Sequence, residues 1–301
     1  MAKLTLGPLL FNWSAEKRRD FYARIADEAP VDAVYLGEVV CAKRAPFSDP
    51  LLPDLIERLE RAGKAVVLST LGLVMSAHDR EMVRRTCEVA DRLIEANDLS
   101  AVHRLAGRPF TLGPLVNVYD EGTLSYLAGL GAIRACLPPE LPLKAIRELA
   151  VSRTAEIEVQ VFGRLPLAIS ARCPHARAYK LHKDSCQYVC GEDPDGLPVA
   201  TMDHQPFLAV NGLQTLSGAY ANYLGDLPAM RDAGVQWFRL SPQDCDMVHV
   251  TMIFRSALDE ACDGEEANAS LAGLVPEVEF ADGFLGGAAG RSVTPSRCKP
   301  S

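Results

Sequence analysis

The feature of this sequence that most constrains its fold is a repeated alternation of short apolar runs with longer amphipathic stretches. We predict strands at 4–9, 33–36, 65–68, 101–104, 112–118, 132–137, 157–161 and 235–240. We predict helices at 16–29, 54–62, 79–96, 121–130, 143–152, 225–233 and 244–261. Strands that alternate with helices form a parallel sheet, and eight such units favour closure into a barrel over an open sheet. The sequence therefore predicts an α/β fold, a TIM-barrel-like (βα)8 domain.

A short repeat agrees with a barrel. The segment Thr-Leu-Gly-Pro-Leu occurs at 5–9 and again at 111–115, in the first and the fifth predicted strands. A duplicated half-barrel would place the same segment in these two strands, although a match of this length can also arise by chance.

The stretch 162–224 interrupts the alternation. It is too long for a loop in a compact domain, and it contains an Asn-Gly pair at 211–212 between two apolar runs, a pattern typical of a β-hairpin. We interpret this stretch as a functional insertion after the seventh strand. The barrel domain, with its insertion, is expected to span 1–262. The acidic and then glycine-rich stretch 263–301 is expected to be a partly disordered tail.

Net charge and hydropathy bear on whether the chain binds nucleic acid or crosses a membrane. The formal net charge of −8 at pH 7 argues against general binding to a nucleic-acid backbone. No run approaches the roughly 20 apolar residues that a membrane-spanning helix needs. The start of the chain also lacks the small-residue cleavage site of a signal peptide. We expect a cytoplasmic protein with no membrane span and no nucleic-acid partner.

Nine cysteines are scattered along the chain, an odd number that does not suit a disulfide framework. In a reducing compartment, clustered cysteines more often bind metals or take part in catalysis. Cys173, Cys186 and Cys190 lie inside the insertion, and Cys41 follows the second strand. Because a parallel barrel collects the loops after its strands at one end, all four thiols can meet there. Four thiolates can hold either zinc or an iron–sulfur cluster, and the spacing alone does not choose between them.

The other cysteines have a simpler interpretation. Cysteine often serves as a small buried hydrophobe. We assign that role to Cys87, Cys136, Cys245 and Cys262, and we expect Cys298 to be a free thiol in the tail. Replacing Cys87, Cys136 or Cys245 is therefore expected to leave a metal site intact.

Charged residues near the four cysteines are further candidates. The basic ones are Lys43, Arg44, Arg164, Arg172, Arg177, Lys180 and Lys183. They form either a pocket for an anionic small molecule, with Arg172 as first candidate because it adjoins Cys173, or a set of solvated surface charges. Glu38 is a candidate acid or base, a support for the metal ligands, or a structural ion pair. His175 and His182 could replace a thiolate, which is the less common arrangement.

Two segments make the chain resemble a known family. They are YLGEVVCAKR at 35–44 and FGRLPLAISARC at 162–173, the second followed by KDSC at 183–186 and by Cys190. Together they are similar to the signature region of the peptidase U32 family, and within that family they most resemble the UbiV branch. The resemblance extends over nearly the whole chain, to about residue 262.

This resemblance implies a 4Fe–4S cluster bound by four cysteines, which match Cys41, Cys173, Cys186 and Cys190 here. It also implies a heterodimer with a UbiU-like protein that takes part in oxygen-independent ubiquinone biosynthesis. The pair would hydroxylate the ring of a prenylated quinone precursor without O2. The oxygen atom must then come from another donor, and the basic residues near the cysteines could hold an anionic one.

Other functions have to be weighed against this one. The chain has no H-E-x-x-H zinc motif and no G-x-S-x-G nucleophile motif, so we reject proteolysis. Hydroxylation of RNA bases by a related U32 protein and a non-catalytic scaffold with a structural cluster stay open as alternatives. The acidic net charge and the UbiV-like segments favour the quinone role. If the chain itself is catalytic, Glu38 and Arg172 are the candidate residues.

Overall fold

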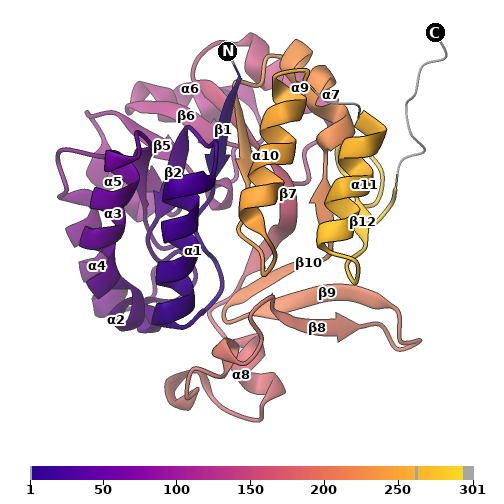
Figure 1. The fold of residues 1–301 in the computed structure, drawn as a ribbon. Coiled ribbons are helices and arrows are strands. Elements are labelled where there is room, and N and C mark those ends of the chain that lie inside the picture. The colour runs from indigo at the N-terminus through magenta and orange to yellow at the C-terminus, as the bar shows by residue number, and fades with distance from the viewer. Residues whose placement is uncertain (1, 262–263, 294–301) are drawn as a thin grey trace, which may run out of the picture.

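The computed structural model describes residues 2–261 and 264–293. Within them, eight parallel strands form a barrel: β1 (Lys3–Leu6), β2 (Ala33–Leu36), β3 (Ala65–Ser69), β4 (Leu93–Ala96), β5 (Phe110–Leu112), β6 (Ala132–Cys136), β7 (Glu156–Ile169) and β11 (Trp237–Leu240). The barrel is closed because β11 pairs in parallel with both β1 and β7, so that Trp237 lies opposite Lys3 on one side and Glu158 on the other. This closure confirms the predicted TIM-barrel-like fold (Figure 1).

Helices surround the barrel. They are α1 (Ala15–Glu28), α3 (Leu52–Arg61), α4 (Ala77–Cys87), α5 (Leu99–Leu105), α6 (Glu121–Gly129), α7 (Leu143–Val151), α9 (Leu227–Ala233) and α10 (Met247–Leu258). Local chemistry sets where they begin: the Ser14 side chain accepts a hydrogen bond from the N–H of Lys17, and Ser76 and Asp79 form a reciprocal capping box. Among the described residues, no helix is long and apolar enough to cross a membrane.

Two stretches of the predicted secondary structure are wrong. The strand predicted at 112–118 is β5 at Phe110–Leu112, and a helical turn, η3 (Pro114–Val116), follows it. We predicted one helix over 79–96 and a strand over 101–104, but α4 ends at Cys87, β4 occupies Leu93–Ala96, and 101–104 belongs to α5. The Asp98 side chain accepts a hydrogen bond from the N–H of Ser100 and so starts α5. Because β4 is only four residues long, it is too short to interrupt the helical periodicity on either side of it.

A charged network fills the middle of the barrel. Arg239 lies 2.7 Å from the Glu95 carboxylate and 3.0 Å from that of Glu158, and all three side chains are buried. Tyr35 donates a 2.6 Å hydrogen bond to Glu158, and Arg134 donates one to the Tyr35 hydroxyl. Burial alone would raise the pKa of Glu158, but Arg239 holds it below its ordinary value. The interior charges are therefore paired with one another.

The predicted insertion leaves the barrel through the second half of β7. It forms three antiparallel strands, β8 (Leu197–Ala200), β9 (Pro206–Asn211) and β10 (Gln214–Asn222), and β10 pairs with β7. Gly212, at φ +60°, makes the turn between β9 and β10, as the Asn-Gly pair predicts. Between β7 and β8 lie α8 (Pro174–Ala178) and two helical turns, η4 (Lys183–Ser185) and η5 (Val189–Gly191). This part lies at the end of the barrel opposite the N-terminus (Figure 1).

Part of the stretch that we expected to be a partly disordered tail forms regular secondary structure. Within 264–293, α11 (Gly264–Leu274) packs against α10, and its Leu271 is fully buried. A short strand, β12 (Phe280–Ala281), pairs with β10. Cys262 and Cys298 lie outside the described residues.

Candidate metal centre

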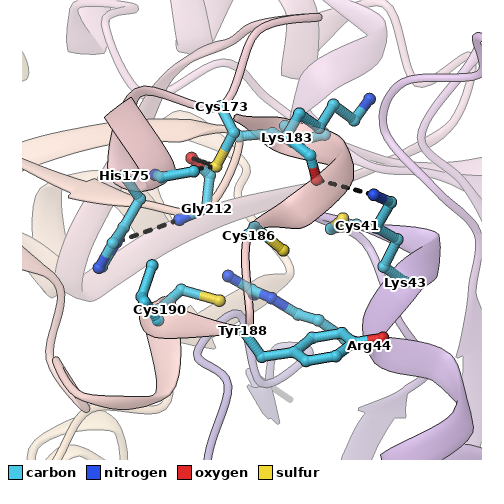
Figure 2. A pocket seen from close by; sticks show the side chains of 13 residues that line it. Cys41, Lys43, Arg44, Cys173, His175, Lys183, Cys186, Tyr188, Cys190 and Gly212 are labelled. Atoms are coloured by element: carbon cyan, nitrogen blue, oxygen red, sulfur yellow. Dashed lines mark hydrogen bonds between the residues drawn. The ribbon is translucent and has the colours of Figure 1, made fainter. Parts of the chain in front are cut away.

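The four cysteines proposed from the sequence border one pocket. Cys41 follows β2 and immediately precedes the helical turn η1 (Ala42–Arg44), Cys173 begins α8, Cys186 follows η4, and Cys190 lies in η5. All four are free thiols, and the space that they border measures about 370 Å³ including its mouth. Figure 2 shows their sulfur atoms around this common space. The fold thus brings together thiols from two distant parts of the chain.

Cys173 is held on two sides. Its Sγ accepts a hydrogen bond from the N–H of Ala176 at 3.3 Å and contacts the carbonyl oxygen of Gly212 at 3.2 Å. We call the segment 170–196, which carries Cys173, Cys186 and Cys190, the cysteine loop. Because Gly212 makes the β9–β10 turn, the second contact joins this loop to the hairpin. Burial raises the pKa of both Cys173 and Cys41, so a metal that binds them has to displace their protons.

Glu38 supports the loop that carries Cys41. Its side chain is 1% exposed, and Oε1 accepts hydrogen bonds from the N–H groups of Val40 and Cys41 at 2.9 and 3.0 Å. The guanidinium of Arg44 lies 4.0 Å from the same oxygen. Of the three roles considered for Glu38, this geometry matches a support for a ligand loop combined with a buried ion pair.

Arg44 places a positive charge in the wall of the pocket. Its Nη1 donates to the carbonyl oxygen of Leu10 at 2.7 Å, and Nη2 donates to the side-chain oxygen of Asn211 at 2.8 Å. Its Nε is buried without a hydrogen-bond partner. Burial acts to lower the pKa of Arg44, but Glu38 and the thiol of Cys190 raise it above its ordinary value. The guanidinium therefore stays charged next to the thiols.

The two histidines are placed differently from the thiols. His175 borders the pocket, but its Nδ1 lies 3.1 Å from the carbonyl oxygen of Val210 and its Nε2 lies 2.9 Å from the carboxylate of Asp193. Both ring nitrogens are therefore engaged within the protein. Burial lowers the pKa of His175 despite the nearby Asp193 carboxylate. His182 lies outside the pocket lining.

Three of the seven basic candidates border the pocket, namely Lys43, Arg44 and Lys183. Lys43 Nζ donates a 2.7 Å hydrogen bond to the carbonyl oxygen of Lys183, which ties the loop after β2 to the cysteine loop. The other four do not border it: Arg164 is ion-paired with Asp195, and Arg172, Arg177 and Lys180 are exposed. Arg172, the first candidate for binding an anion, is therefore not part of this pocket.

The cysteines expected to be structural lie elsewhere in the described chain. Cys87 ends α4, Cys136 ends β6, and Cys245 follows β11, and none of them borders the pocket. Burial raises the pKa of Cys87 to about 11 and that of Cys245 to about 12. These three residues are thiols outside the pocket that can serve as controls.

Sequence reasoning missed two features of the pocket. Tyr188 lines it, and its ring packs edge-to-face against Phe47 with ring centroids 4.8 Å apart. The Asn-Gly pair predicted the hairpin turn, but not that Asn211 binds Arg44. A Cβ on Gly212 would clash with Nη2 of Arg44, so this glycine also leaves room for the guanidinium. These contacts join distant segments and have no local signal in the sequence.

The donor set of the pocket suits an iron–sulfur cluster. Among the described residues, no group of three or more His, Cys, Asp or Glu side chains is placed to hold a metal ion. The fit rests instead on four thiols that face one space and on the partnerless Nε of Arg44, a donor that cluster sulfur could accept from.

Comparison with known proteins finds one matching family model and several similar solved structures. The model of the family described as "Peptidase family U32" matches residues 15–294, which include the cysteine loop and every barrel strand except β1. The solved U32 peptidase Mk0906 is 13% identical, with a TM-score of 0.46, over 81% of this chain and 93% of its own. N-acetylneuraminate lyase from Fusobacterium nucleatum is 9% identical, with a TM-score of 0.45, over 90% of this chain and 79% of its own. Dihydropteroate synthase from Thermus thermophilus is 13% identical, with a TM-score of 0.41, over 89% of this chain and 94% of its own.

Proposed function

This chain belongs to peptidase family U32, and on that premise we propose that it is the iron–sulfur subunit of an oxygen-independent hydroxylase. The observation that carries the proposal is the placement of four free cysteines around one pocket. Cys41, Cys173, Cys186 and Cys190 would bind a 4Fe–4S cluster through their thiolates. The substrate would be the ring of a ubiquinone precursor, and the chain would act with a UbiU-like partner, as its UbiV-like segments suggest.

When bound, a cluster whose irons are all held by cysteine supplies electron transfer, because no iron is left open to substrate. The protein's own contribution is to hold the ligands and balance their charge. Glu38 fixes the backbone of the Cys41 loop, and the N–H of Ala176 holds the sulfur of Cys173. Arg44 supplies a buried positive charge beside thiolates that would otherwise repel one another.

Lys43 and Lys183 are the residues best placed to attract an anionic oxygen donor. Both border the cysteine pocket, and Lys43 is about one-third exposed, with its Nζ 3.4 Å from the exposed carboxylate of Asp184. They take the place of Arg172, which the sequence put forward for this role. A change of Lys183 to glutamine, which keeps the backbone carbonyl that Lys43 binds, would then weaken use of the donor and leave the iron content unchanged.

The function can be tested by deleting the gene from its host. Ubiquinone should fall in cells grown without oxygen and stay normal in aerated cells. The Cys173→Ala variant should fail to restore anaerobic ubiquinone, whereas Cys245→Ala, a change of the same kind at a cysteine outside the pocket, should restore it. Unchanged anaerobic ubiquinone together with a lost RNA base modification would favour the hydroxylation of RNA instead.

A further inference from the structure

A second pocket lies at the mouth of the barrel. Gly7 and Pro8 line it after β1, Pro114 and Leu115 line it after β5, and Gln214 lines it at the start of β10. The two copies of the Thr-Leu-Gly-Pro-Leu repeat therefore meet at one site. The space measures about 360 Å³ including its mouth. It lies at the carboxyl ends of the barrel strands, where proteins of this architecture bind their small-molecule ligands.

Gln214 has an unusual environment in this pocket. Its side chain is completely buried, yet neither the oxygen nor the nitrogen of its carboxamide has a hydrogen-bond partner. A buried polar group without a partner costs about 1–3 kcal/mol, so such groups are rare unless something else satisfies them. The carboxamide thus presents an NH2 donor group and an acceptor oxygen, side by side, with no partner among the described residues.

Each of the other polar side chains that line this pocket has at least one partner within the protein, and the Ser241 hydroxyl accepts a hydrogen bond from Gln243. Asn97 donates to the carbonyl oxygen of Thr70 and to Glu95, and Gln160 donates to the carbonyl oxygen of Arg164. Arg239 is paired with carboxylates in the barrel. Among the described residues that line the pocket, Gln214 alone has buried side-chain atoms left without a partner to bind a ligand.

We propose that this pocket binds a neutral, flat molecule through a paired hydrogen bond with the carboxamide of Gln214. The ligand has to carry a donor and an acceptor next to each other, because that edge complements a carboxamide. It has to be neutral, because Arg239, the one charged residue among the described residues that line the pocket, is balanced by carboxylates within the barrel. Proline and aliphatic side chains form much of the remaining wall, which suits the faces of a ring.

The pocket also adjoins the four cysteines. Leu10 and Val39 line it, and both belong to the apolar cluster that contains Cys173 and Leu213, two residues of the cysteine pocket. A ring bound in this pocket would therefore lie against the same apolar cluster as the thiol of Cys173. The ligand site itself rests on Gln214 and does not depend on a cluster being bound.

The test uses 2-pyridone, a flat neutral ring whose N–H and C=O lie side by side, and the full chain purified without oxygen. Saturation-transfer NMR should show saturable binding to the wild-type protein. N-methyl-2-pyridone lacks the donor and should bind at least about tenfold more weakly, which corresponds to the loss of about one net hydrogen bond. Gln214→Leu should weaken 2-pyridone binding by at least the same factor.

Two controls separate this outcome from loss of folding. Gln205→Leu makes the same chemical change at an exposed site and should leave binding unchanged. Gln214→Leu removes two partnerless atoms and should therefore not lower Tm. Iron is measured on the same samples, so the metal centre and the ring site are judged separately. Absence of saturable 2-pyridone binding, equal binding of both compounds, or a lower Tm for Gln214→Leu would overturn the proposal.

Discussion

Nη2 of Arg44 donates a 2.8 Å hydrogen bond to the side-chain oxygen of Asn211. Arg44 follows Cys41 by three residues, and Asn211 precedes Gly212, whose carbonyl oxygen contacts the Cys173 thiol. The bond therefore joins the two parts of the chain that carry the four cysteines. Arg44 both fixes the relative position of these parts and brings a positive charge to them.

Replacing Arg44 by methionine should lower the reduction potential of the proposed cluster. The buried guanidinium stabilises the reduced, more negative state more than the oxidised one, so its removal favours oxidation. If the guanidinium favours the reduced state over the oxidised state by about 1.4 kcal/mol, its removal lowers the reduction potential of a one-electron couple by about 59 mV. Arg44→Lys keeps the charge and should shift the potential less. A redox titration monitored by electron paramagnetic resonance measures the shift, and an unchanged potential in Arg44→Met would show that the charge does not act on the cluster.

Glu38→Ala should release the Cys41 loop and reduce the iron retained after purification. The carboxylate accepts the N–H groups of Val40 and Cys41, and leaving buried donors without a partner costs about 1–3 kcal/mol. Glu38→Gln keeps an acceptor oxygen and should retain more iron. If Glu38 were instead an acid or base in the reaction, Glu38→Gln would keep its iron but lose activity as completely as Glu38→Ala.

Asp32 should make the barrel sensitive to acid. Burial alone would raise its pKa, but the N–H of Leu4 and the cations of Lys3 and Arg255 lower it below the ordinary value. Because the folded pKa is depressed, the stabilisation is present above the unfolded pKa of about 3.9 and is lost as pH falls through the lower folded value. Thermal unfolding of the wild type and Asp32→Asn should differ by a steady amount from pH 7 down to about pH 4, and the difference should shrink as pH falls further, through the folded pKa. A difference in Tm that does not shrink below about pH 4 would contradict the assignment.

Single alanine changes at Cys41, Cys173, Cys186 or Cys190 should each deplete iron sharply, because each removes one ligand of the proposed cluster. The same change at Cys87, Cys136 or Cys245 should leave iron nearly intact, since these thiols lie outside the pocket. Iron is measured by atomic emission on protein confirmed to be folded by circular dichroism. Equal loss of iron in both groups would argue that stability, and not ligation, explains the result.

The barrel could be predicted because its elements are encoded locally. Strand periodicity, helix caps and the Asn-Gly turn act over a few residues, and most predicted elements agree with the structure to within a few residues. The prediction failed at β4 and α5 because it relied on these local signals alone. Three of the four residues of β4 are buried, but its pairing with β3 and β5 is a long-range contact that a helical periodicity can hide.

Some features of the candidate site could likewise be predicted from the sequence, and others could not. The loop positions of Cys41, Cys173, Cys186 and Cys190 follow from strand order, because loops after parallel strands gather at one end of a barrel. The partners of Arg44 and the isolation of the Gln214 carboxamide depend on contacts between segments far apart in sequence. Arg172 shows that adjacency in sequence does not predict a position in the pocket, because it adjoins Cys173 in sequence but does not border the pocket.

The central claim is that Cys41, Cys173, Cys186 and Cys190 hold one 4Fe–4S cluster. The most direct measurement is the iron and acid-labile sulfide content of the chain purified and reconstituted without oxygen, combined with Mössbauer spectroscopy. We predict a brown protein with about four irons and about four sulfides per chain and the spectrum of a 4Fe–4S centre. Stoichiometric zinc without iron after anaerobic reconstitution would contradict the claim.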